Sequence, residues 1–134
     1  MDFLQQIQKL NPTNGYNLLR ITAGGFLLPH GLEKFTNWGV NPHAVEFFQI
    51  VGFTPPQLWV AIAGLAELIV GISLFLGIFT RAAALGGLAI MILAIYALHT
   101  AKGFIWLWNL GGYEYPIFWG IAFITIFMNT RKKQ

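Results

Sequence analysis

The chain has 134 residues with 56% hydrophobic and 10% charged side chains, whereas about 25% of the residues of a soluble domain carry a charge. No cysteine is present, which excludes disulfides, iron–sulfur clusters and thiolate chemistry within this chain. The net charge of +3 does not predict a nucleic-acid partner, because five of the eight basic residues lie outside or at the ends of apolar runs.

Four apolar runs predict membrane-spanning helices. They cover residues 16–35, 57–79, 82–101 and 115–129. A helix needs about 20 mostly apolar residues to cross the hydrocarbon of a bilayer, a length that the first three runs reach and the last approaches. The first 14 residues are polar, and no cleavage site follows the first run. We therefore expect no cleaved signal peptide.

The loop between the first and second spans is expected to contain a further helix. Asn41 and Pro42 are typical of a helix start, with asparagine as N-cap and proline at the first position. Mostly apolar residues follow as far as Val51, which favours a short helix in the membrane interface. The predicted fold class is thus all-α. We expect a single domain over residues 1–134, an integral membrane four-helix bundle with a short interfacial helix in the first outer loop.

Basic residues predict the orientation. Four spans place both termini and the loop between the second and third spans on one side of the membrane. Six of the eight basic residues lie on that side, namely Lys9, Arg20, Arg81, Arg131, Lys132 and Lys133. Lys34 and Lys102 lie on the other side, together with interfacial aromatic residues, namely Trp38, Trp59, Trp106, Trp108, Tyr113 and Tyr115. The positive-inside rule then predicts a multi-pass protein with cytoplasmic N- and C-termini.

Small residues recur on one face of each of the first two spans. The stripe in the first span is Arg20, Gly24, Leu27, Gly31 and Lys34, and the stripe in the second is Val60, Gly64, Glu67, Gly71, Leu74 and Ile78. Such faces let the backbones of membrane helices approach closely. Glu67 lies on the glycine face in mid-membrane, so its carboxyl group should face the bundle and find a cation or stay protonated. Lys34 is the first candidate for that cation, and Arg20 is the second.

Polar residues gather at the predicted outer ends of the spans. The candidate catalytic residues are His30, Lys34, Glu67, His99 and Glu114, and the candidate cofactor-binding residues are His30, His99 and Lys102. Two histidines could ligate a haem or another metal. However, no histidine pair lies four residues apart and no third ligand is evident, so we predict no metal site.

A binding site for a quinone headgroup places fewer requirements on the surrounding side chains than a metal site does. It requires hydrogen-bond donors for two carbonyl oxygens, a group that exchanges protons, and an apolar slot for the tail. Histidine titrates near neutral pH and can relay such a proton. The same residues could instead form an interfacial ion-pair network that only fixes the bundle, and both interpretations remain open.

The order of these residues resembles the DoxX family of small bacterial membrane proteins. The resemblance covers about residues 19–127. It rests on Arg20 with Gly24, on His30-Gly31 and Lys34, on residues 64–81 (GLAELIVGISLFLGIFTR), on His99 and on residues 111–114 (GGYE). It implies a four-helix protein of the bacterial inner membrane that acts as an oxidoreductase, with relatives that look like a subunit of a thiosulfate:quinone oxidoreductase.

Two functions are therefore expected. The first is a quinone-linked membrane oxidoreductase or a subunit of one. Its partners would be the lipid bilayer, quinone, and other membrane or redox subunits or a second copy of the chain. The alternative is a non-enzymatic accessory subunit or small transporter that binds an apolar or anionic molecule.

Overall fold

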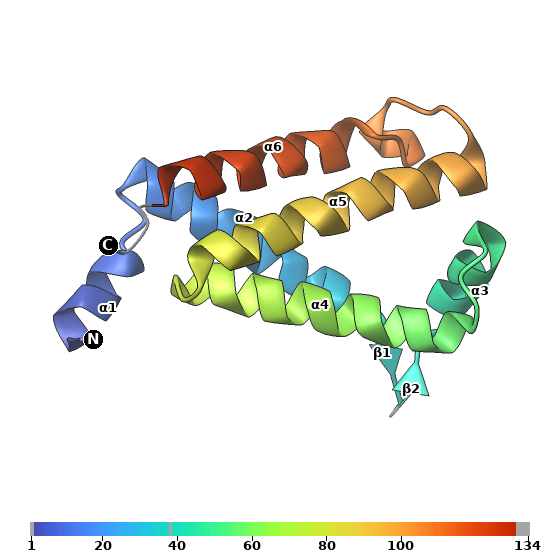
Figure 1. The fold of residues 1–134 in the computed structure, drawn as a ribbon, viewed down its shortest axis with the longest axis horizontal. Coiled ribbons are helices and arrows are strands. Elements are labelled where there is room, and N and C mark those ends of the chain that lie inside the picture. Colours follow the sequence, from blue (N-terminus) through green and yellow to red (C-terminus); the bar gives the residue numbers. More distant parts are fainter. Residues whose placement is uncertain (1, 38, 131–134) are drawn as a thin grey trace.

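The computed structural model describes residues 2–37 and 39–130, in which six α-helices account for most of the chain (Figure 1). The helices are α1 (Phe3–Lys9), α2 (Gly15–Leu32), α3 (Pro42–Val51), α4 (Pro56–Leu76), α5 (Thr80–Lys102) and α6 (Glu114–Asn129). The other elements are the two-residue strands β1 (Phe35–Thr36) and β2 (Gly39–Val40) and the short 3₁₀ helix η1 (Trp108–Leu110). All four predicted spans and the predicted loop helix are helical.

The four long helices form a closed ring of contacts. Helix α2 packs on α4, α4 on α5, α5 on α6, and α6 returns to α2. Figure 1 shows α1 at one end of this bundle, and α3 with the β1–β2 ribbon at the other. The apolar core between the helices includes Leu27, Leu74, Met91, Phe123 and Ile126.

Two of the described helices, α4 and α5, are long and apolar enough to cross a membrane by length and composition. Helix α2 has 18 residues and carries Arg20 and His30, whereas α6 has only 16 residues. At 1.5 Å per residue, α6 is about 24 Å long, somewhat less than the hydrocarbon core of a typical bilayer.

The boundaries differ from the predicted ones where turns intervene. Helix α4 ends at Leu76 rather than at residue 79, because Gly77 and Phe79 both have positive φ angles, of 72° and 48°. The first span ends at Leu32, and the following residues form the antiparallel β1–β2 ribbon, in which Phe35 pairs with Val40. The all-α prediction is corrected to this extent. Helix α1 was also not predicted.

The start of α3 agrees with the sequence prediction. The Asn41 side chain accepts a hydrogen bond from the backbone N–H of His43, and Pro42 occupies the first helical position. Trp38, Arg131, Lys132 and Lys133, which contributed to the orientation prediction, lie outside the described residues.

Two pairs of glycines bring α2 and α4 together, and we call Gly24, Gly31, Gly64 and Gly71 the glycine seam. A Cβ atom added at Gly24 would lie 2.8 Å from the carbonyl oxygen of Gly71, and one added at Gly31 would lie 2.9 Å from that of Gly64. Side chains at these positions would push the helices apart. The predicted small-residue faces therefore do pack against each other.

Two arginines bind carbonyl groups at helix C-termini, at the end of the bundle opposite α3. The buried guanidinium group of Arg20 donates hydrogen bonds to the carbonyl oxygens of Leu74 and Phe75 at the end of α4, and to that of Lys9. Arg81 donates to the carbonyl oxygens of Phe127 and Thr130 at the end of α6, both at 3.3 Å. A cation is favourable there because the last carbonyls of a helix lack partners and carry partial negative charge.

Candidate functional site

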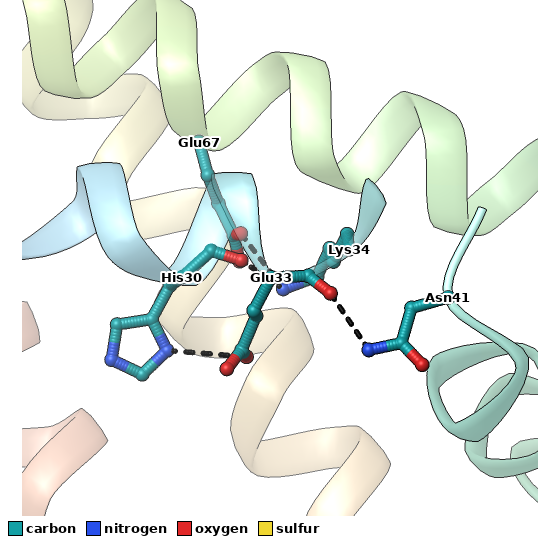
Figure 2. Close-up of polar contacts among 5 residues, drawn as sticks. All are labelled: His30, Glu33, Lys34, Asn41 and Glu67. Atoms are coloured by element: carbon teal, nitrogen blue, oxygen red, sulfur yellow. Dashed lines mark hydrogen bonds and ion pairs between the residues drawn. The ribbon is translucent and has the colours of Figure 1, made fainter. Parts of the chain in front are cut away.

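An ion pair between Lys34 and Glu67 lies where the C-terminal end of α2 meets α4 (Figure 2). Lys34 Nζ is 2.8 Å from Glu67 Oε2, and the two side chains are only 12% and 11% exposed. Lys34 Nζ also donates a hydrogen bond of 3.1 Å to the carbonyl oxygen of His30 in the last turn of α2. The ammonium group thus neutralises the Glu67 carboxylate and compensates the negative end of the helix dipole. Of the two predicted partners of Glu67, Lys34 is confirmed.

The glycine seam brings this pair together. Glu67 lies one turn from both Gly64 and Gly71 on the buried face of α4. The ring of Phe35 packs so closely on Gly64 that an added Cβ would lie 2.5 Å from it. Because α2 and α4 approach closely, Lys34, just after the C-terminus of α2, reaches Glu67 on α4.

The residues after α2 are fixed by Asn41, the N-cap of α3. Asn41 Nδ2 donates to the carbonyl oxygen of Glu33 at 2.8 Å, and the backbone N–H of Asn41 donates to the carbonyl oxygen of Lys34, also at 2.8 Å. The segment that carries Lys34 is therefore held on both sides, by α4 and by the start of α3.

The imidazole of His30 points away from the ion pair (Figure 2). His30 Nδ1 lies 3.7 Å from Glu33 Oε1, a distance that makes an ion pair only when the imidazole is protonated. The ring packs edge-on against Trp119 of α6, with 5.4 Å between the ring centroids. We call His30, Glu33, Lys34 and Glu67 the α2–α4 cluster. Glu33 was not among the predicted site residues.

His99 has a different set of contacts, in the last turn of α5. Its Nδ1 lies 2.6 Å from the hydroxyl oxygen of Tyr113, and that hydroxyl donates to the carbonyl oxygen of Gly103 at 2.7 Å. A tyrosine hydroxyl has one proton, so His99 Nδ1 must be the donor to Tyr113. This leaves Nε2 of a neutral His99 as a hydrogen-bond acceptor. Tyr113 was predicted as an interfacial aromatic residue and not as a site residue. Its place in the Gly-Gly-Tyr-Glu motif was the available signal.

Glu114 and Lys102 do not join the ion pair. Glu114 opens α6 as predicted, and its Oε2 accepts a hydrogen bond of 3.1 Å from the backbone N–H of Trp108, which fixes the loop before the helix. Lys102 is exposed and lies beside Gly111. Within residues 2–37 and 39–130, no hydrogen bond or ion pair links His99 or Lys102 to the α2–α4 cluster, and no three His, Asp or Glu residues are grouped to hold a metal.

Comparison with known proteins identifies a family. The DoxX family model matches residues 15–100, a segment that runs from α2 to near the end of α5 and includes His30, Lys34, Glu67 and His99. No match was found among curated proteins or among solved structures.

Proposed function

This chain belongs to the DoxX family and is a membrane protein, and from that premise we propose that it is a quinone-linked oxidoreductase, or a subunit of one, in the bacterial plasma membrane. In this proposal α2, α4, α5 and α6 each cross the bilayer, and the N- and C-termini are cytoplasmic. The bilayer, quinone, and other redox subunits or a second copy of the chain are the proposed partners.

The contacts of Arg20 support a membrane position for α2 despite its charge. The Arg20 side chain is buried, and its guanidinium group is directed at backbone carbonyls rather than outward. Charged residues within membrane spans are tolerated when they face the bundle interior and pair with backbone carbonyls. The proposed orientation rests on the excess of basic residues in the sequence, six on the side of the termini and of the turn between α4 and α5 against Lys34 and Lys102 on the other side.

The observation that carries the functional proposal is the Lys34–Glu67 ion pair. Removing the two charges from water costs several kcal/mol per ion. Apolar side chains at these positions would therefore stabilise the contact between α2 and α4 at least as well, so stability alone does not explain the ion pair. Ionisable residues within a membrane span mark proton and substrate pathways by default. The pair lies one turn beyond His30, whose imidazole could donate or accept a hydrogen bond there.

The chemistry of these residues fits a quinone headgroup. A bound quinone supplies reversible two-electron, two-proton chemistry. In our proposal His30 and His99 hydrogen-bond the headgroup or relay protons, and Lys34 and Lys102 stabilise developing negative charge. Glu67 accepts a proton, and Glu114 orients the loop that carries Trp108.

A second candidate function is non-enzymatic. The polar residues form separate groups, with His99 on Tyr113 and His30 beside Glu33, rather than one converging site. That separation favours an accessory subunit or small transporter that binds an apolar or anionic molecule without transforming it.

Quinone binding by purified protein tests the proposal. Wild-type protein in mild detergent should retain extractable quinone and bind added quinone. Glu67→Gln keeps the shape of the side chain and removes its charge, so we expect normal folding and loss of quinone binding. Glu46→Gln, at an exposed position of α3, is the matched control and should behave like wild type. Quinone-free wild-type protein that binds none on titration would favour the second candidate.

A further inference from the structure

An apolar groove of about 470 Å³ lies between α2 and α6. Its α2 wall is formed by Leu19, Thr22, Ala23 and Phe26, its α6 wall by Tyr115, Phe118, Trp119 and Ala122, and Trp108 and Glu114 also line it. Its volume lies within the range of about 300–1,000 Å³ that is typical of small-molecule sites.

The groove has a floor of small side chains and a rim of large ones. Ala23 is buried at the floor, whereas the rim residues Phe26 and Phe118 are 65% and 76% exposed. Trp119 Nε1 donates to the carbonyl oxygen of Ala23 at 3.2 Å, which ties the two walls together. Most of the lining side chains are apolar, and the Trp119 indole N–H and the Glu114 carboxylate already have hydrogen-bonding partners within the protein, so the groove favours an apolar occupant.

His30 lies one helical turn beyond Phe26, the last residue of α2 that lines this groove. Residues 19, 23, 26 and 30 follow one face of α2 at helical spacing, so His30 continues the stripe that forms the α2 wall. Its ring also packs against Trp119 of the opposite wall. The stripe therefore leads from the groove to His30, which lies beside Glu33 of the α2–α4 cluster, and Glu114 is the carboxylate that lines the groove itself.

We propose that this groove binds the isoprenoid tail of a membrane quinone and that the quinone headgroup lies at its outer end beside His30. The inference rests on the proposed function. Helices α2 and α6 are both spans in that proposal, so the open side of the groove faces the bilayer and receives its ligand from there. From residue 19 to residue 30 the helix rises about 16 Å, which accommodates an extended apolar chain. An apolar trough that ends at titratable groups matches an apolar chain that ends in a polar head.

Two probes with one headgroup separate tail binding from headgroup binding. One is a benzoquinone without a tail, and the other is the same benzoquinone with a decyl chain. Quenching of the intrinsic tryptophan fluorescence in mild detergent reports both affinities. For wild-type protein we expect the decyl compound to bind tighter by about tenfold or more, because the groove buries its methylene groups.

Filling the groove should abolish this preference. Ala122→Phe places an aromatic ring within the groove. We expect this variant to bind both probes with the affinity that wild-type protein has for the tailless quinone. Ala82→Phe, at an exposed position of α5, is the control and should keep the wild-type preference. Phe26→Ala removes an exposed wall residue without filling the core, and it should lower the preference even if Ala122→Phe does not fold.

The outcomes separate this inference from the proposed function. If the tailless quinone binds and the decyl chain adds nothing, or if the filled groove keeps the preference, the groove inference is wrong and the proposed function stands. If neither probe binds, both fail. If Ala122→Phe loses co-purified phospholipid but keeps its full preference for the decyl compound, the groove is a phospholipid site and the inference is overturned.

Discussion

Gly24 and Gly25 are adjacent in α2, and replacing each with alanine should have opposite effects on stability. A Cβ atom at Gly24 would lie 2.6 Å from Leu74 Cβ, and 2.8 Å from both the Gly71 carbonyl oxygen and the Phe75 backbone nitrogen. A Cβ atom at Gly25 would meet only the Phe75 ring, at 3.5 Å, which is an ordinary contact.

The two variants share every effect except the packing against α4. Glycine to alanine in a helix is favourable by about 0.5–1 kcal/mol in either position. At position 24 the close atoms include backbone of α4, so the helices must separate by roughly half an ångström, and overpacking of this kind costs about 1–3 kcal/mol. We expect Gly25→Ala to be as stable as wild type or more stable, and Gly24→Ala to be less stable than Gly25→Ala by about 1–3 kcal/mol.

Thermal unfolding of the purified protein in one mild detergent measures the difference. Both variants change the same atoms in adjacent residues, so effects of detergent and expression cancel. Equal midpoints for the two variants would refute the glycine seam as a close contact. A lower midpoint for Gly25→Ala would mean that α2 is rotated about its axis, so that Gly25 rather than Gly24 faces α4.

Three further predictions concern orientation and polar contacts. A cysteine replacing Arg81 should resist an impermeant thiol reagent in intact cells, while one replacing Trp106 should react; the reverse pattern would invert the proposed topology. The charge-reversed double variant Glu67→Lys with Lys34→Glu should give more folded protein than either single variant, as size-exclusion chromatography would show; no recovery would contradict a direct pair. Tyr113→Phe should lower the free energy of unfolding by about 0.5–1.5 kcal/mol, the usual net contribution of a hydrogen bond, because the partners His99 and Gly103 are exposed and can bond to water instead; an unchanged unfolding midpoint would argue against the His99–Tyr113–Gly103 link.

The sequence alone predicted the four long helices and α3, and it predicted the face of α2 and the face of α4 that pack against each other; it did not predict α1. A helix over residues 42–51 follows from Asn41 and Pro42, since capping depends on residues adjacent in the chain. The stripes with Gly24 and Gly71 indicate contact surfaces because helical periodicity fixes which residues share a face. Because Glu67 was expected to face the bundle, the sequence also limited its candidate ion-pair partners to Lys34 and Arg20. The structure shows the ion pair with Lys34.

Helical periodicity does not predict loop geometry or the spacing between helices. The β1–β2 ribbon depends on backbone pairing across a turn, and no apolar pattern indicates it. The link from His99 through Tyr113 to Gly103 depends on how the loop after α5 folds back. His30 and His99 were both predicted at the outer ends of spans, but they make separate contacts because each side chain projects from its own helix in a different direction.

The sequence by itself determined that four long apolar segments and residues 42–51 are helical, which faces of α2 and α4 carry small residues, and which ionisable residues lie in or near the apolar runs. These properties depend on side-chain type and on spacing within one helix. Tertiary structure decided that Lys34 reaches Glu67, that His30 turns toward Trp119, and that a groove remains between α2 and α6. Each of these depends on the rotation and separation of two helices, which are set by the packing of all four together.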